Sequence, residues 1–435
     1  MSAERALSSE ASLAPGVVAG AGAGHATATA AEPCHVALLG FGTVGSAFAE
    51  LLESRAEEIA ALCGRRPELS GVLTRSRGSF PDVLDSADVV VELIGGIEPA
   101  REYLLRAIEA GKHVVTANKQ LLCEHGEQLF DAARRHGVQL RFEAAVGGVI
   151  PVVRVLQESL AGAHVDRIHG IVNGTTNFIL SEMASGASYA EALGEAQRQG
   201  IAEADPSEDV SGKDAAAKMA ILARLAFGTP ISLREVRYEG IEHLHSDDLL
   251  YARELGLGLK LIGTAERLDD RISVRVHPAF LYAGHPLASV SGPFNAVTVE
   301  SPAITEITMS GPGAGGVQTA SAVLGDLVSA VTQPAVPMPP ARPLELASDV
   351  ESAFYLHVEV ADRPGVLAAV AGVLGDHGAS IRSVLQRGIG DHARLAMVTH
   401  KLAEARLREA TRMIAELDLV RSSPRAIPVI EEEFK

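Results

Sequence analysis

Residues 35–45 read HVALLGFGTVG, a pattern typical of a strand, a glycine turn and the start of a helix. The apolar run at 35–39 predicts a buried strand, and apolar residues follow at helical spacing over 47–52. Between them lies a GxGxxG turn, whose glycines let backbone amides approach a pyrophosphate at the N-terminus of the helix. A tight structural turn is the alternative. We expect a dinucleotide site formed by Gly40, Phe41, Gly42, Thr43, Val44 and Gly45.

Further apolar runs follow this first strand and helix. They lie at residues 89–94, 113–117 and 140–144, and the first two lead into stretches compatible with a helix. Strands that alternate with helices are typical of a parallel, doubly wound sheet. The sequence therefore predicts an α/β domain of the Rossmann type.

The end of the second expected strand bears on which nicotinamide cofactor is used. NAD sites usually carry an acidic residue there for the ribose hydroxyls, but the chain reads GVLTRSR over residues 71–77. Arginine suits a 2′-phosphate, so Arg75 favours NADP, with NAD as the alternative. The structural alternative is that Arg75 and Arg77 are solvated surface residues.

Length, composition and charge narrow the class of protein. With 435 residues, the chain is long enough for about three domains. Hydrophobic residues make up 47% of it and no run reaches the roughly 18 apolar residues of a membrane span. The net charge of −17 argues against nucleic acid as a partner. Three scattered cysteines fit a reducing compartment, so we expect a cytoplasmic protein.

Changes in composition divide the chain into five parts. Residues 151–334 mix longer helical segments, such as 211–227, with strands such as 271–276, which predicts an α+β domain whose late segment returns to the nucleotide site. Four prolines in AVPMPPARP at 335–343 predict a stiff linker. We expect a disordered extension at 1–32, a dinucleotide-binding domain at 33–150, a catalytic and dimerisation domain at 151–334, a linker at 335–350 and a βαββαβ regulatory domain at 351–435.

Two further stretches carry polar residues suited to chemistry. The segment TANK at 116–119 follows a strand at the sheet edge where α/β proteins bind ligands. The segment 202–218 reads AEADPSEDVSGKDAAAK, and its Asp214 and Lys218 are four residues apart, so they share one face of a helix. Such a pair is most often a solvated surface bridge. Here small residues surround it and an acidic loop precedes it, which favours a buried lysine held by carboxylates.

Taken together, the motifs resemble those of the homoserine dehydrogenases. They are GFGTVG at 40–45, TANK at 116–119, EAAVGG at 143–148, NGTTNFIL at 173–180, AEADPSEDVSGKDAAAK at 202–218 and GPGAGGVQTASAVLGD at 311–326. The resemblance covers about residues 33–330, and ADRPGVLAAVAGVLGDHGASI at 361–381 resembles an ACT domain.

This resemblance implies a reversible, NAD(P)-dependent interconversion of L-aspartate 4-semialdehyde and L-homoserine, in the biosynthesis of threonine, methionine and isoleucine. It also implies feedback regulation through the ACT domain, for which we hypothesise L-threonine as the effector. A homodimer or homotetramer is expected, since symmetric oligomers are common.

The resemblance also implies roles for individual residues. Lys119 or Lys218 would exchange a proton with the substrate oxygen, with a pKa lowered by the site, and Asp214 would orient them. The substrate would contact Glu203, Asp209, Gly174 and Thr175, while the cofactor would contact Thr116, Lys119, Gly313 and Gly315 besides the glycine turn and Arg75. A sodium or potassium ion would be held by Glu143, Val146, Gly148 and Ile150, since hard cations favour such oxygens.

Three other interpretations compete with this one. His243 and His245, with Asp247 and Asp248, could form a metal site, but a surface loop is favoured. A phosphorylating semialdehyde dehydrogenase would need a nucleophilic cysteine, and Cys123 has no motif around it. A non-catalytic amino-acid sensor is disfavoured because both lysines and both key acids are present together.

Overall fold

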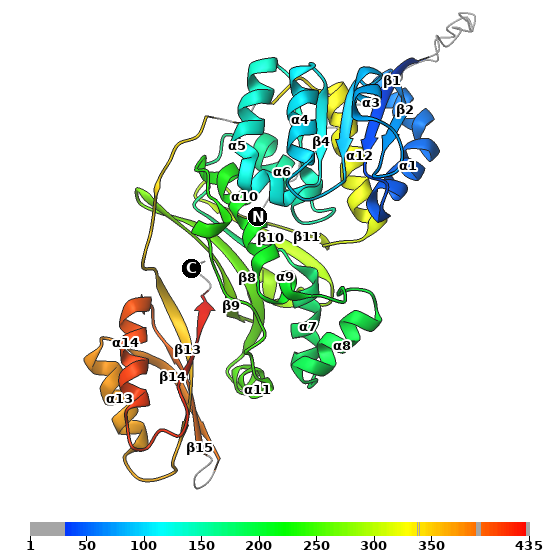
Figure 1. Cartoon of the computed structure of the whole chain (residues 1–435). Coiled ribbons are helices and arrows are strands. Elements are labelled where there is room, and N and C mark those ends of the chain that lie inside the picture. The colour runs from blue at the N-terminus through cyan, green and yellow to red at the C-terminus, as the bar shows by residue number, and fades with distance from the viewer. Residues whose placement is uncertain (1–30, 337, 339, 389–392, 432–435) are drawn as a thin grey trace, which may run out of the picture.

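The computed structural model describes residues 31–336, 338, 340–388 and 393–431, and the expected N-terminal extension lies almost wholly outside them. Figure 1 shows three parts in a row: a helix-covered sheet formed by the N-terminal region, a central sheet with helices on it, and a smaller C-terminal unit. The predicted fold class is confirmed, since a parallel five-stranded sheet is followed by a mixed sheet that extends into a βαββαβ unit.

The first sheet is parallel throughout, in the order β2-β1-β3-β4-β5. Its strands are β1 (Glu32–Leu39), β2 (Arg65–Leu73), β3 (Val89–Glu92), β4 (His113–Thr116) and β5 (Leu140–Arg141). The helices around it are α1 (Thr43–Ser54), α2 (Ala56–Cys63), α3 (Phe80–Asp85), α4 (Ala100–Glu109), α5 (Lys119–His136) and α12 (Gly316–Thr332). Every residue of β3 is buried, as expected for a central parallel strand with helices on both faces.

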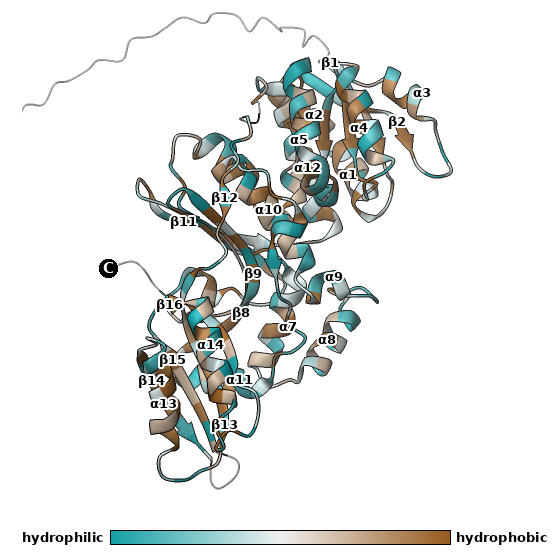
Figure 2. Ribbon diagram, turned by 60° about the vertical axis from the view of Figure 1, so that its left-hand side comes forward, coloured by the Kyte–Doolittle hydropathy of each residue, from teal (hydrophilic) through white to brown (hydrophobic). Residues whose placement is uncertain are grey.

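The last of these helices returns from far along the chain. α12 packs on α1, and Ala320, Val323 and Leu327 share a core cluster with Phe48 and Leu52. Figure 2 shows the strands of this sheet in brown between helices of mixed brown and teal. The helical layer on the first sheet therefore includes a helix that follows the strands of the central sheet in the sequence.

The central part is built on a long, mostly antiparallel sheet. Its strands are β6 (Arg167–Ile171), β7 (Arg237–Tyr238), β8 (Leu257–Leu268), β9 (Arg271–Tyr282), β10 (Phe294–Ser301) and β11 (Thr305–Pro312). The short β7 pairs in parallel with β9. The helices are α6 (Val152–Arg154), α7 (Gly174–Ala184), α8 (Tyr189–Arg198), α9 (Ser207–Val210), α10 (Lys213–Phe227) and α11 (Ser246–Glu254), with short 3-10 or π segments η1 (Glu143–Ala145), η2 (Val155–Ser159), η3 (Leu233–Glu235) and η4 (Pro286–Ser289). Glycine brings helix and sheet together, because a Cβ on Gly263 of β8 would lie 2.3 Å from Met219 Cγ of α10.

The C-terminal part continues the same sheet. It comprises β13 (Glu351–Val360), α13 (Val366–Asp376), β14 (Ile381–Arg387), β15 (Ala393–Thr399), β16 (Leu402–Ala403), α14 (Glu404–Ala415) and β17 (Arg425–Ile430), after a short β12 (Glu345–Leu346) in the connecting segment. β17 pairs with β13 on one side and with β9 on the other, so the strand order runs β11-β10-β6-β8-β9-β17-β13-β15-β14. The two domains therefore share one sheet.

A buried charge cluster reinforces this junction. Asp248 of α11 accepts a hydrogen bond from Arg425 Nε at 3.0 Å and lies 2.7 Å from His357 Nδ1 of β13. Burial alone would raise the pKa of Asp248, but His357 and Arg425 hold it below its usual range. The expected surface loop is thus wrong for Asp248, which lies in α11 and is fully buried. Sequence spacing could not show this contact because its partners lie more than 100 residues away in the chain.

One predicted strand is shorter than expected. β5 ends at Arg141, and residues 143–145 form the turn η1 in place of the strand predicted to Ala144. The Glu143 amide donates to Asp326 Oδ2 of α12 at 2.7 Å, and this side-chain acceptor replaces a strand partner. Among the described residues, no helix combines the length and apolar character that a membrane crossing needs.

The Asp248 cluster generates a stability prediction. We expect Asp248→Ala to lower the free energy of unfolding by about 3–5 kcal/mol, because it leaves His357 and Arg425 without their carboxylate at a largely buried site. The measurement is urea denaturation followed by circular dichroism.

The matched control is the adjacent Asp247→Ala. Asp247 pairs with Arg394 at 3.0 Å, but its side chain is 43% exposed, so its loss is expected to cost about 1 kcal/mol or less. Equal effects of the two substitutions would refute the role given to the cluster.

Candidate active site

Two lysines from different domains meet on one carboxylate. Lys119 Nζ, at the start of α5, lies 2.8 Å from Asp214 Oδ1, and Lys218 Nζ of α10 lies 2.7 Å from Asp214 Oδ2. Lys218 Nζ also donates to the carbonyl oxygen of Val172 at 2.8 Å. The Asp214 side chain is 6% exposed, against 13% for Lys218 and 33% for Lys119. α5 and α10 pack on each other, as Figure 1 shows. The predicted Asp214 and Lys218 pair is therefore buried and shared with Lys119.

The charges of this cluster stabilise each other. Burial alone would raise the pKa of Asp214, but Lys218 and Lys119 hold it well below its usual range. Burial alone would lower the pKa of Lys119, yet Asp214 raises it above the ordinary value. The expectation of a lowered lysine pKa is therefore not met at Lys119, because the carboxylate 2.8 Å away outweighs the burial. At neutral pH this lysine is an ammonium that can give up a proton.

Asn173 is the residue that sequence reasoning missed. Its Nδ2 donates to Asp214 Oδ2 at 2.9 Å and to Asp209 Oδ1 at 2.7 Å, while its Oδ1 caps α7 by accepting the Thr176 amide. The pKa of Asp209 is raised by burial, although Asn173 opposes this. The residues NGTT at 173–176 are of types common in turns, and the preference of Asn for a helix N-cap was the signal available in the sequence. Its second role, linking two acids, depends on contacts distant in sequence.

The other expected substrate residues surround this cluster less tightly. Thr175 is buried, and its Oγ1 donates to the Ile201 carbonyl oxygen at 3.1 Å. Gly174 lies against the next loop, since a Cβ there would be 2.7 Å from the Pro293 carbonyl oxygen. Glu203 is exposed, and its backbone oxygen accepts from Gln197 Nε2. The structure therefore connects Asp209 to the lysine–aspartate cluster through Asn173, whereas Glu203 is exposed to solvent.

The glycine turn after β1 has the form that a pyrophosphate needs. Gly40 has a φ of +100°, and a Cβ on it would lie 2.5 Å from the Leu93 carbonyl oxygen. At Gly42, by contrast, a Cβ would meet nothing within 4 Å, and the turn leads into the twelve-residue helix α1. Thr43, Val44 and Gly45 form the first turn of that helix, and Phe41 is 48% exposed. An open approach at Gly42 and a helix N-terminus together fit a phosphate group.

The turn after β2 lies beside this glycine turn. The Gly40 amide donates to the Leu73 carbonyl oxygen at 2.9 Å, and the Thr74 amide donates to the Arg77 oxygen at 2.8 Å, which closes the turn that carries Arg75. Arg75 is exposed. Thr116, which is expected to contact the cofactor, is buried at the end of β4, and its Oγ1 donates to Glu92 Oε2 at 2.6 Å. The Thr116 side chain therefore holds the loop that leads to Lys119 in place by hydrogen bonds.

The late glycine loop also returns to this place. A Cβ on Gly316 would lie 3.0 Å from Thr43 Cγ2, so the loop before α12 touches the glycine turn. Gly315 is the N-cap of α12 with a φ of +130°, and a Cβ on Gly313 would lie 2.3 Å from Asn295 Oδ1. The contact of Gly316 with Thr43 thus brings the end of this loop to the glycine turn, whereas Gly313 packs against β10 of the central domain.

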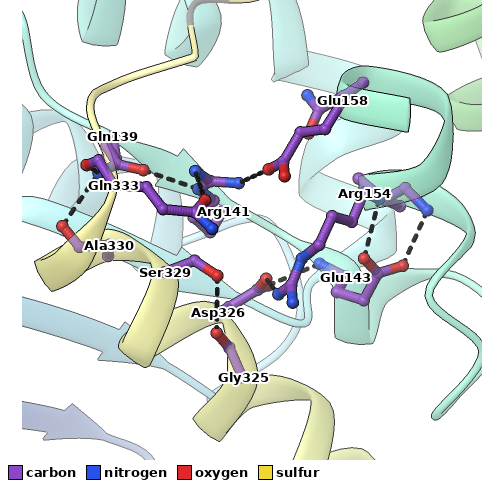
Figure 3. Close-up of polar contacts among 12 residues, drawn as sticks. Gln139, Arg141, Glu143, Arg154, Glu158, Gly325, Asp326, Ser329, Ala330 and Gln333 are labelled. Atoms are coloured by element: carbon purple, nitrogen blue, oxygen red, sulfur yellow. Dashed lines mark hydrogen bonds and ion pairs between the residues drawn. The ribbon is translucent and has the colours of Figure 1, made fainter. Parts of the chain in front are cut away.

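Figure 3 shows the contacts of Glu143, the first residue of the expected cation loop, with Arg154 and Asp326. The Glu143 carboxylate accepts the amides of Val153 at 2.8 Å and Arg154 at 2.9 Å. Burial raises the pKa of Glu143 to about 7 and that of Asp326 to about 6. Val146, Gly148 and Ile150 follow in a buried or half-buried loop, in which Gly148 has a φ of +67°. Buried acids next to backbone carbonyls are compatible with a monovalent cation. Within the described part of the chain, His, Cys, Asp and Glu nowhere form a group of three or more suited to a metal ion.

Comparisons with known protein families agree with this geometry. Residues 40–143 match the family described as "Homoserine dehydrogenase, NAD binding domain", and residues 151–328 match that described as "Homoserine dehydrogenase". Residues 354–418 match the ACT domain.

Individual relatives extend over nearly the whole chain. A homoserine dehydrogenase of Neisseria gonorrhoeae is 40% identical over 420 residues, covering 89% of this chain and 97% of that relative. The crystal structure of a homoserine dehydrogenase from Thiobacillus denitrificans is similar with a TM-score of 0.85 at 39% identity, covering 92% of this chain and 99% of that one. A hyperthermophilic archaeal homoserine dehydrogenase, solved in complex with NADPH, matches with a TM-score of 0.60 at 27% identity over 70% of this chain and 99% of that one. The chain therefore belongs to the homoserine dehydrogenase family, with which it shares the nucleotide-binding domain, the central domain and the C-terminal ACT domain.

Proposed function

We propose that the chain interconverts L-aspartate 4-semialdehyde and L-homoserine through the cluster of Lys119, Asp214 and Lys218. The supporting observation is that Lys119 of the nucleotide-binding domain and Lys218 of the central domain both contact the carboxylate of Asp214. A reaction between a cofactor on one domain and a substrate on the other needs its proton-transferring group at that boundary. When bound, the nicotinamide accepts or supplies the hydride.

The proton step is assigned to the two ammonium groups. In the reduction, the carbonyl oxygen of the semialdehyde gains a proton from a lysine as its carbon receives the hydride; in the oxidation, the hydroxyl proton returns to that lysine. Lys218 is held by two oxygens, which fixes its position, and the raised pKa of Lys119 keeps a proton available. Asp214 positions both lysines.

The substrate's amino-acid end belongs on the acidic side of the cluster. Asp209 and Glu203 are the acids that would receive its ammonium group, and Asn173 holds Asp209 in place at 2.7 Å. Gly174 and Thr175 form the adjacent wall at the start of α7. Because Glu203 is exposed, we assign it a role at the rim of the site.

NADP is the proposed cofactor, because Arg75 lies on the turn beside Gly40 and arginine suits a 2′-phosphate. The proposed pyrophosphate site is the turn from Gly40 to Gly45, and Gly313, Gly315 and Thr116 are proposed as further cofactor contacts. A sodium or potassium ion is proposed at the loop of Glu143, Val146, Gly148 and Ile150, where it would offset the buried acids.

Regulation and assembly complete the proposal. The ACT domain is proposed to bind a small-molecule effector, L-threonine in the first instance, and the enzyme to act as a homodimer or homotetramer. Cys34, Cys63 and Cys123 are all unpaired, which supports a cytoplasmic location.

Substitution of Lys218 tests the proposed chemistry. We expect Lys218→Ala to lower kcat for L-homoserine oxidation by about 100-fold or more, since general acid–base groups contribute about 10²–10⁴-fold. Lys218→Arg should not restore it, because arginine keeps the charge but does not release a proton near neutral pH. Nicotinamide absorbance measures the rate.

Lys213→Ala is the matched control on the same helix. Lys213 is 43% exposed and pairs with Glu208 at 2.8 Å, so its loss should change kcat less than twofold. A Lys218→Arg variant as fast as the wild type would show that charge alone suffices, and an inactive wild type would favour the sensor.

Substitution of Arg75 tests the cofactor assignment. We expect Arg75→Ala to raise KM for NADP about tenfold while KM for NAD stays within twofold, because only NADP carries the phosphate that a charge-assisted hydrogen bond would hold. The measurement is steady-state kinetics with each cofactor. Arg55→Ala, an exposed arginine paired with Glu58 at 2.8 Å, is the control. Equal losses for both cofactors would contradict the assignment.

A further inference from the structure

A buried acid lies at the carboxyl end of the nucleotide-binding sheet. Glu92 is the last residue of β3, the middle strand of the five, and it is fully buried. It lies opposite Leu39 of β1 on one side and Thr116 of β4 on the other. This is the end of a parallel sheet at which α/β proteins bind their ligands. The proton transfer proposed above gives Glu92 no part.

Neutral donors alone satisfy the Glu92 carboxylate. Its Oε1 accepts the amides of Ile94 at 2.7 Å and Gly95 at 3.0 Å, and its Oε2 accepts the Thr116 hydroxyl at 2.6 Å. In the described ranges of the chain, no cationic side chain pairs with it. A buried acid without a cation is costly. An apolar residue would avoid that cost but would leave these donors unpaired.

The first loop that Glu92 holds follows its own strand. The Gly95 amide turns back onto Oε1, and Gly95 and Gly96 have φ values of +77° and +72°, which glycine adopts without strain. The start of this loop touches the glycine turn, since a Cβ on Gly40 would lie 2.5 Å from the Leu93 carbonyl oxygen. Glu92 therefore holds a loop that borders the proposed pyrophosphate site.

The second loop follows β4 and ends at Lys119. Thr116 Oγ1, which donates to Glu92, accepts the Asn118 amide at 3.0 Å. The Asn118 side chain caps α5 and donates through Nδ2 to the Gly96 carbonyl oxygen at 2.6 Å. The two loops are therefore joined twice, through the carboxylate of Glu92 and through the side-chain amide of Asn118.

This junction sets where the side chain of Lys119 begins. Lys119 follows Asn118 directly and is the first residue of α5, and its Nζ lies 2.8 Å from Asp214 Oδ1. A hydrogen bond of this kind weakens as its distance and angle depart from the optimum. In an active site, a misplacement of about 1 Å can lower the rate about 100-fold. The loops that fix the start of α5 therefore matter for the proton step.

We propose that Glu92 is a positioning residue that ties the loops after β3 and β4 together and thereby holds Lys119 in place for proton transfer. The proposal rests on the function proposed above, in which Lys119 takes part in the proton step. The loss of Glu92 therefore falls on kcat. KM for L-homoserine stays within about twofold, because Asp209 and Glu203, the acids proposed for the substrate's ammonium group, belong to the central domain.

A double-mutant cycle on kcat for L-homoserine oxidation at saturating NADP tests the proposal. It compares Glu92→Gln, Lys119→Ala and the double variant with the wild type. Glu92→Gln keeps the shape of the side chain but replaces an acceptor by a donor. Alone it should lower kcat by about tenfold or more. In the Lys119→Ala background it should lower kcat less than twofold, because the side chain that it positions is gone.

Asp88→Asn is the matched control, because it makes the same chemical change at the opposite end of β3. Asp88 directly precedes the strand, its side chain is 39% exposed, and it pairs with Arg65 at 2.9 Å. Its substitution should change kcat less than twofold.

Two substitutions of Thr116 guard against a folding defect in Glu92→Gln. Thr116→Val removes the hydroxyl that links the two loops, so it should lower kcat as Glu92→Gln does, whereas Thr116→Ser keeps the hydroxyl and should retain at least about half of the wild-type kcat. Circular dichroism checks that each variant is folded.

Three results would overturn the positioning role: wild-type kcat in a folded Glu92→Gln variant, equal fold losses from Glu92→Gln with and without Lys119, or equal kcat in the two Thr116 variants. Equal fold losses beside a slow Lys119→Ala variant would leave the proposed proton step intact. A Lys119→Ala variant as fast as the wild type would contradict that step as well.

Discussion

The carboxylate of Asp214 is the constraint on which the rest of the site depends. It is 6% exposed and lies within 2.8 Å of two ammonium groups, one from each of two domains. A buried carboxylate with neither lysine would cost several kcal/mol of desolvation, and two buried lysines without it would repel each other. The cluster therefore holds the N-terminus of α5 against α10, and it fixes the boundary at which cofactor and substrate meet.

The neighbouring structure serves to hold this cluster in place. Asn173 links Asp214 to Asp209 by hydrogen bonds, and the Val172 carbonyl oxygen accepts a second hydrogen bond from Lys218 Nζ. On the other side, α12 crosses back to the nucleotide-binding sheet, where Asp326 accepts the Glu143 amide. The chain thus passes between the domains more than once, so the separation of the two lysines is set by several independent contacts.

Local pattern predicted the parts of this site that lie close in sequence. The four-residue spacing of Asp214 and Lys218 is a property of any helix, and the strand before Lys119 places that lysine at a sheet edge. Distant contacts left weaker signals: no role was expected for the Asn173 side chain, and Asp248 was expected in a surface loop although Arg425 and His357 contact it in the interior. Nothing in the sequence indicated the importance of Gly240. A side chain is excluded there because its Cβ would lie 1.9 Å from the Val210 carbonyl oxygen.

The most direct test of the central role of Asp214 is the pH dependence of L-homoserine oxidation in Asp214→Asn, with circular dichroism as the check on folding. Because Asp214 raises the pKa of Lys119, its loss should lower that pKa, so the base form needed for oxidation is reached at lower pH. We predict a fall in kcat/KM of about 100-fold or more, with the rise of the remaining activity shifted to lower pH. A folded variant with the wild-type kcat/KM and an unshifted pH profile would contradict the account.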